Sequence, residues 1–109
     1  MSQSEYVTFR QELKKTLEDL EQMLCEKNKQ YGNSALNPLR ICSKASTIEQ
    51  LHVRIDDKLS RIKRGTDETE DTYKDLAGYF ILLCMARNEE IKKEIDRQTS
   101  AQVNSLTRP

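Results

Sequence analysis

The side chains best suited to chemistry are five acids in the middle of the chain, Glu49, Asp56, Asp57, Asp71 and Asp75. Glu49, His52 and Asp56 follow one another at steps of three and four, and Asp71 and Asp75 lie four residues apart. Such spacing places carboxylates on one face of a helix, and two helices packed antiparallel across Gly65 would bring Asp56 or Asp57 toward Asp75. Clustered carboxylates repel one another unless a cation holds them, and hard oxygen ligands favour Mg²⁺ or Mn²⁺. These five acids are therefore candidate metal ligands.

Two other interpretations of the same acids stay open. On helices this rich in charge, carboxylates are often simply solvated. They can also form internal ion pairs with the interleaved cations Arg54, Lys58 and Arg61. Only a metal cluster predicts that removing one carboxylate relieves repulsion in the metal-free protein.

A second candidate site is a turn that precedes these helices. Gly32 allows close approach of the backbone to a ligand, Tyr31 offers a ring for base stacking, and Asn33 can bind a base or sugar edge. Cations that could neutralise phosphates are Lys29, Lys44, Arg54 and Lys58. The structural alternatives are that Tyr31 fills a gap in the core and that Gly32 ends a helix.

Three helices are expected to position these residues. The first runs from about Ser4 to about Asn28 and begins with a Ser-x-x-Glu capping box. The second opens with the same motif at Ser46 and ends at Gly65. The third follows the acidic segment 66–71, which suits a helix N-terminus.

Other segments complete the expected architecture. A short helix can begin at Pro38, and Gly78 is expected to allow close packing of helices. The polar segment 98–109 lacks periodicity and is expected to be a disordered tail. Since nothing alternates as a strand does, we predict an all-α fold in which residues 1–97 form a single domain.

Composition restricts the functional classes. The chain has 109 residues with 18 basic and 18 acidic side chains, so bulk electrostatics give no reason to expect binding to long nucleic acid. No apolar run is long enough to span a membrane, and the first residues do not resemble a signal peptide, which predicts a soluble cytoplasmic protein. Three cysteines without metal-ligand spacing are expected to be reduced and at least partly buried.

An apolar stripe on the first helix predicts self-association. Its members recur at steps of three and four and are Tyr6, Phe9, Leu13, Leu17, Leu20 and Leu24. Three helices from one short chain bury a limited core. We therefore expect a homo-oligomer that covers this stripe.

Several segments together resemble a known family. They are Lys27–Ser34, Leu39–Ala45, Arg54–Ile62 and Lys74–Phe80, and the most specific are Tyr-Gly-Asn-Ser and Arg-Ile-Asp-Asp-Lys-Leu-Ser-Arg. The chain resembles the small phage and bacterial proteins called nucleotide-modification-associated domain one. These are similar in turn to the MazG-like, all-α nucleoside triphosphate pyrophosphatases. The resemblance covers about residues 26–86.

The resemblance implies an oligomeric helical bundle that binds a nucleotide between its helices. In MazG-like enzymes, Glu-x-x-Glu and Glu-x-x-Asp pairs hold Mg²⁺, which activates water to split the α–β phosphate bond. By this resemblance Asp57 and Asp75 would be the catalytic acids. The pattern is incomplete, because Thr72 and His52 occupy positions where the family carries acids.

Two functions follow as hypotheses. The first is a Mg²⁺-dependent pyrophosphohydrolase acting on a deoxynucleotide or modified nucleotide. The second is a phage-type sponge, in the host cytoplasm if a phage encodes it, that sequesters a nucleotide or cyclic-nucleotide signal without cleaving it. A helical assembly module without a ligand is a third interpretation, but it leaves the turn after Tyr31 unexplained.

Overall fold

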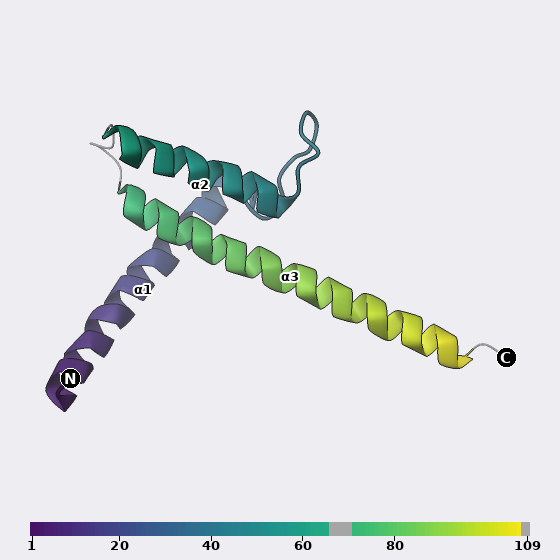
Figure 1. Cartoon of the computed structure of the whole chain (residues 1–109), viewed down its shortest axis with the longest axis horizontal. Helices are drawn as coiled ribbons and strands as arrows, with labels where there is room; N and C mark the ends of the chain where they lie inside the picture. The colour runs from purple at the N-terminus through teal and green to yellow at the C-terminus, as the bar shows by residue number, and fades with distance from the viewer. Residues whose placement is uncertain (66–70, 108–109) are drawn as a thin grey trace.

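In the part of the chain that the structure describes, three helices make up the fold, and the loop between the first two is irregular (Figure 1). The computed structural model describes residues 1–65 and 71–107, with only the backbone of 105–107. The helices are α1 (Gln3–Tyr31), α2 (Thr47–Arg64) and α3 (Thr72–Thr107). The described residues contain no strand, and the predicted all-α class is confirmed.

The helices begin where the sequence places their caps. The Ser2 Oγ accepts a hydrogen bond from the Glu5 N–H at 3.2 Å, and the Ser46 Oγ accepts one from the Glu49 N–H at 3.1 Å. Both bonds satisfy amides that a helix N-terminus leaves without an intrahelical partner. At α3 the same role falls to Asp71, whose Oδ1 accepts from the Lys74 N–H at 3.0 Å.

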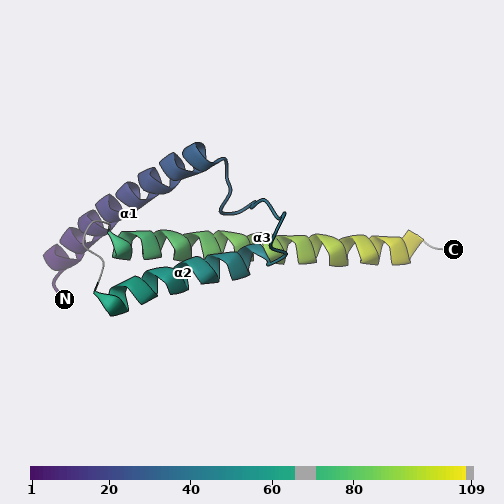
Figure 2. The same ribbon diagram turned by 90° about the horizontal axis from the view of Figure 1, so that it is seen from above.

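The core lies mainly between α2 and α3, which run antiparallel and side by side (Figures 1 and 2). Leu51, Ile55 and Leu76 are buried there. Burying such side chains is the main favourable contribution to folding. This hairpin places the middle of α2 beside the first turns of α3, and the residues at that contact form part of the site.

The C-terminal part of α1 crosses α3 at Gly78. A Cβ atom added to Gly78 would lie 3.0 Å from Met23 Cε and 3.2 Å from Leu24 Cδ2. Leu20 on α1 is also buried. The expectation that Gly78 allows close helix packing is confirmed, and the neighbour is α1 of the same chain.

Three local expectations were wrong. Residues 98–107 continue α3 rather than forming a disordered tail, because extending an existing helix needs no new nucleus and no Gly or Pro interrupts it before Pro109. Residues 39–42 are irregular rather than helical. The cysteines Cys25, Cys42 and Cys84 are exposed rather than buried. Residues 66–70 and 108–109, which complete the expected acidic entry and tail, lie outside the described residues.

Both long helices extend beyond this small core. The N-terminal part of α1 and the C-terminal part of α3 project as separate arms (Figure 1), and the radius of gyration is 19.4 Å. A compact chain of this length would have a radius of about 13 Å. No helix among the described residues is long and apolar enough to cross a membrane.

Candidate functional site

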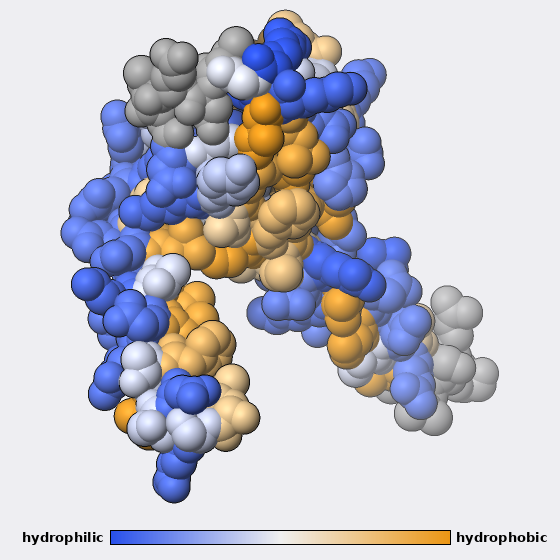
Figure 3. All heavy atoms as spheres, turned by 60° about the vertical axis from the view of Figure 1, so that its left-hand side comes forward, coloured by the Kyte–Doolittle hydropathy of each residue, from blue (hydrophilic) through white to orange (hydrophobic). Residues whose placement is uncertain are grey.

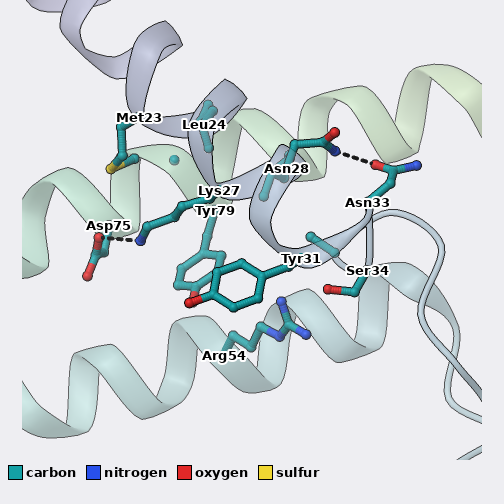
Figure 4. Close-up of a pocket in the computed structure, with 13 residues that line it drawn as sticks. Met23, Leu24, Lys27, Asn28, Tyr31, Asn33, Ser34, Arg54, Asp75 and Tyr79 are labelled. Atoms are coloured by element: carbon teal, nitrogen blue, oxygen red, sulfur yellow. Dashed lines mark hydrogen bonds and ion pairs between the residues drawn. The ribbon is translucent and has the colours of Figure 1, made fainter.

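A cleft of about 280 Å³ lies where the end of α1 approaches the α2–α3 hairpin (Figure 4). All three helices and the turn after α1 contribute to its wall. The lining residues are Met23, Leu24, Lys27, Asn28, Tyr31, Asn33, Ser34, Ala35, Arg54, Asp75, Gly78, Tyr79 and Leu82. The wall thus combines aliphatic side chains with two tyrosine rings and several polar groups.

One carboxylate in this cleft is held between two ammonium groups. Asp75 Oδ1 lies 3.2 Å from Lys27 Nζ, and Asp75 Oδ2 lies 3.1 Å from Lys58 Nζ. Burial by itself would raise the pKa of Asp75. The hydrogen bonds and positive charges of Lys58 and Lys27 outweigh that effect and hold the pKa of Asp75 below its ordinary value.

The ion pairs tie the three helices together. Lys27 comes from α1, Lys58 from α2 and Asp75 from α3, and only 8% of the surface of Lys58 is exposed. The charged side chains that line the cleft are Lys27, Arg54 and Asp75, two positive and one negative, and Lys58 lies behind Asp75. The cleft is therefore electrostatically suited to an anionic ligand.

Aromatic rings stand beside these charges. Tyr31 at the end of α1 is 61% exposed, so the alternative that it fills a core gap is wrong. Tyr79 lines the cleft from α3, and Arg54 extends from α2 toward the rings (Figure 4). A tyrosine ring and the planar guanidinium of an arginine can both stack on a flat ligand ring.

The turn after α1 has a structural explanation. Gly32 adopts φ 63° and ψ 40° and ends the helix, and an added Cβ would meet no atom within 4 Å. The alternative that Gly32 is a C-cap is therefore confirmed, and nothing crowds it. Asn33 also has a positive φ of 62°, and its Oδ1 accepts a hydrogen bond from Asn28 Nδ2 at 2.7 Å. This bond fixes the Asn33 side chain at the rim of the cleft.

Only some of the predicted nucleotide-binding residues meet in the cleft. Tyr31, Asn33 and Arg54 line it, while Lys58 lies behind Asp75. Lys29 faces a different groove, and Lys44 is exposed in the loop before α2 and lines none of the described cavities.

Sequence reasoning missed two of the most informative lining residues, Lys27 and Tyr79. Lys27 precedes Tyr31 by one helical turn, and Tyr79 follows Asp75 by one turn. Residues four apart share a helix face, so both could have been grouped with the residues that were predicted. No comparable pattern in the sequence indicated that α1 approaches α3 at this point.

The predicted metal ligands do not come together. Asp57 pairs with Arg61 at 3.2 Å, Glu49 pairs with His52 at 3.5 Å, and both pairs are exposed. Asp56 is exposed on α2, and Asp71 caps α3. Within residues 1–65 and 71–107, no three Asp, Glu, His or Cys side chains form a group that could hold a metal ion.

The expected approach of Asp56 or Asp57 to Asp75 is replaced by that of Lys58. Leu51, Ile55 and Lys58 follow one another at steps of four and three, so all three face α3 from the same side of α2. Asp56 and Asp57 are rotated away from that side. Of the three cations considered for internal ion pairs, Lys58 pairs with Asp75 and Arg61 pairs with Asp57. Arg54 lines the cleft instead, and Asp56 is exposed.

Comparison with known proteins adds no further identification: the chain matches no protein-family model, no curated protein and no solved structure. The resemblance to the MazG-like proteins stays a prediction, and a functional interpretation rests on the cleft.

Proposed function

We propose that the chain binds a nucleotide in the cleft between α1, α2 and α3 and does not hydrolyse it. The observation that carries this proposal is the combination of two tyrosine rings with a cationic wall whose one carboxylate is already held by two lysines. Of the two hypotheses derived from the sequence, this is the non-hydrolysing sponge.

The chemistry of the wall suits the two parts of a nucleotide. A base can stack on Tyr31 or Tyr79, a contact worth about 1–3 kcal/mol in other nucleic-acid-binding proteins. Arg54 can bind a phosphate through two parallel N–H donors, and Lys27 adds a second positive charge. Ligand pockets usually have volumes of about 300–1,000 Å³. A cleft of about 280 Å³ lies just below this range, so a ligand that fills it would be small, of the size of one nucleotide.

Magnesium-dependent hydrolysis has less support. It requires several carboxylates around the metal, and the donor set of the described residues does not fit Mg²⁺ or Mn²⁺. Asp75, the expected catalytic acid, is engaged by Lys27 and Lys58. Asp67, Glu68 and Glu70 lie outside the described residues, so the hydrolase is retained as an explicit outcome of the experiment.

The test is equilibrium binding to a panel of mono-, di-, tri- and cyclic nucleotides, with EDTA or with Mg²⁺, followed by chromatography of the recovered ligand. We expect binding in EDTA and recovery of intact nucleotide under both conditions. Formation of monophosphate and pyrophosphate only with Mg²⁺ would establish the hydrolase instead. Absence of binding by every nucleotide would overturn the proposal.

Substitutions locate the binding. Tyr31→Ala and Arg54→Gln should each weaken the affinity by about tenfold, since each removes one stacking or charge-assisted contact. Both side chains are exposed enough that folding should be unaffected. Lys44→Gln is the control, because Lys44 is a cation outside the cleft and its loss should leave the affinity unchanged. If Arg54→Gln and Lys44→Gln weaken binding equally and Tyr31→Ala does not weaken it, binding is non-specific attraction to positive charge.

A further inference from the structure

The chain exposes far more surface than a compact monomer. Its accessible surface is 9230 Å², whereas a compact protein of 12.7 kDa exposes about 6,200 Å². The excess is about 3,000 Å², and a large obligate dimer interface removes about 1,000–2,500 Å² from each partner. The surface available is thus sufficient for a stable interface with another chain.

α3 exposes large apolar side chains between Tyr73 and Val103, and the free arm of α1 exposes a comparable set. Tyr6, Leu13 and Leu17 are each 44–50% exposed there, and the hydrophobic side chains form a band along the arm (Figure 3). Two grooves of about 550 and 610 Å³ follow this face and share Leu17 and Glu21. The apolar face therefore continues along α1 to the junction with α3.

Charges along the same face change sign from one end to the other. The groove on the free arm is lined by Arg10 and Lys14 toward the N-terminus and by Glu18 and Glu21 toward the C-terminus. A helix with this pattern is complementary to itself when a second copy lies antiparallel. A parallel copy would place like charges opposite one another, which is unfavourable.

We propose that the occupant of this face is a second copy of the chain, with the two α1 helices packed antiparallel. A two-fold axis close to Lys15 and Thr16 sets Leu13 beside Leu17 of the second copy. The same register sets Arg10 and Lys14 of each chain opposite Glu21 and Glu18 of the other. An interface of this kind is self-complementary and closes as a dimer.

The groove at the α1–α3 junction completes the fit. It lies beyond Leu17 and includes Leu24, Leu36 and Met85. In the antiparallel register the Tyr6 end of the second copy reaches this groove. This groove shares Leu24, Asn28, Asn33 and Leu82 with the wall of the cleft, whereas Arg54 and Asp75 lie outside it. The dimer is therefore tested in the absence of nucleotide.

The test uses charge reversal and the mass of the nucleotide-free protein in solution. Wild type should have twice the 12.7 kDa monomer mass by light scattering at micromolar concentration. Arg10→Glu with Lys14→Glu makes the face wholly acidic, and Glu18→Lys with Glu21→Lys makes it wholly basic. Each double variant should be monomeric, with circular dichroism confirming that it stays helical.

Combining the charge reversals tests the antiparallel register of the two α1 helices. The chain carrying all four reversals should regain the dimer mass, and an equimolar mixture of the acidic and basic variants should form a heterodimer. Glu12→Lys with Asp19→Lys is the control. It makes the same change in net charge as the basic variant but outside the α1 grooves, so this variant should remain a dimer.

Three results would overturn the proposal. A monomeric wild type would leave the face without a second copy, and another partner or a lipid surface would then have to cover it. Dimeric double variants would place the interface elsewhere on the chain. A monomeric fourfold variant, if helical, would show that the helices do not pair in the antiparallel register.

Discussion

Asp75 connects three helices through one carboxylate. Lys27 approaches one oxygen and Lys58 approaches the other, so removing this acid affects contacts from α1 and α2 together. Breaking a hydrogen bond between charged groups that are shielded from water is more destabilising than breaking an exposed one. Asp57 offers the contrast, because its pair with Arg61 spans one helical turn at the surface.

Asp75→Asn should therefore destabilise the protein, by about 1–3 kcal/mol, and the loss should be the same with EDTA and with Mg²⁺. Asp57→Asn should change the free energy of unfolding by about 0.5 kcal/mol or less. Thermal melts of both variants under both conditions measure the difference. If either substitution raises stability in EDTA and lowers it in Mg²⁺, the acids hold a metal and the ion-pair interpretation is wrong.

The pH dependence of stability follows from the same group. The pKa of Asp75 is lower in the folded protein than in the unfolded chain, so the folded state favours the ionised carboxylate. Its contribution is complete above the unfolded pKa of about 4 and is lost as the pH falls through the lower folded value. Melts of wild type and Asp75→Asn should converge in this acid range, and a constant difference down to the lowest pH would contradict the assignment.

At the scale of elements, the sequence predicted local structure better than contacts between helices. Ser2, Ser46 and Gly65 marked helix ends correctly because capping depends on residues within one turn. Pairing of Lys58 with one of the acids was only one of the alternatives left open, because the choice among them depends on the rotation of α2 against α3. The crossing of α1 over Gly78, which forms the cleft, joins segments about 50 residues apart and leaves no periodic signal.

Gly78→Leu tests whether that crossing forms the cleft. A larger side chain would collide with Met23 and Leu24, and overpacking of this kind usually costs about 1–3 kcal/mol. We expect a lower melting temperature and weaker nucleotide binding, because α1 must move away from α3. Ala77→Leu is the control, since Ala77 is exposed one position earlier and should tolerate the change. Equal effects of the two substitutions would show that α1 does not pack on α3 at Gly78.

At the scale of the whole molecule, the three helices of one chain bury only a small apolar core. Five apolar residues of the described part are buried, namely Leu20, Leu51, Ile55, Leu76 and Ala86. Most of them belong to the α2–α3 hairpin and its crossing with α1, whereas the free arm of α1 keeps its apolar side chains exposed. Most helical stability in proteins comes from packing an apolar face, so the arm requires a neighbour to be stable as a helix.

Stability should consequently depend on protein concentration. If two chains fold and pair together, mass action raises the melting temperature with concentration. For a dimer of this size the entropy of unfolding predicts a rise of about 3 °C for each tenfold increase. Melts of wild type over a hundredfold range should show this slope. The Arg10→Glu, Lys14→Glu variant should melt lower and at a temperature independent of concentration, because its like-charged arms repel. A flat wild-type series would mean that α1 is stable without a second copy, and the excess surface would then need a different partner.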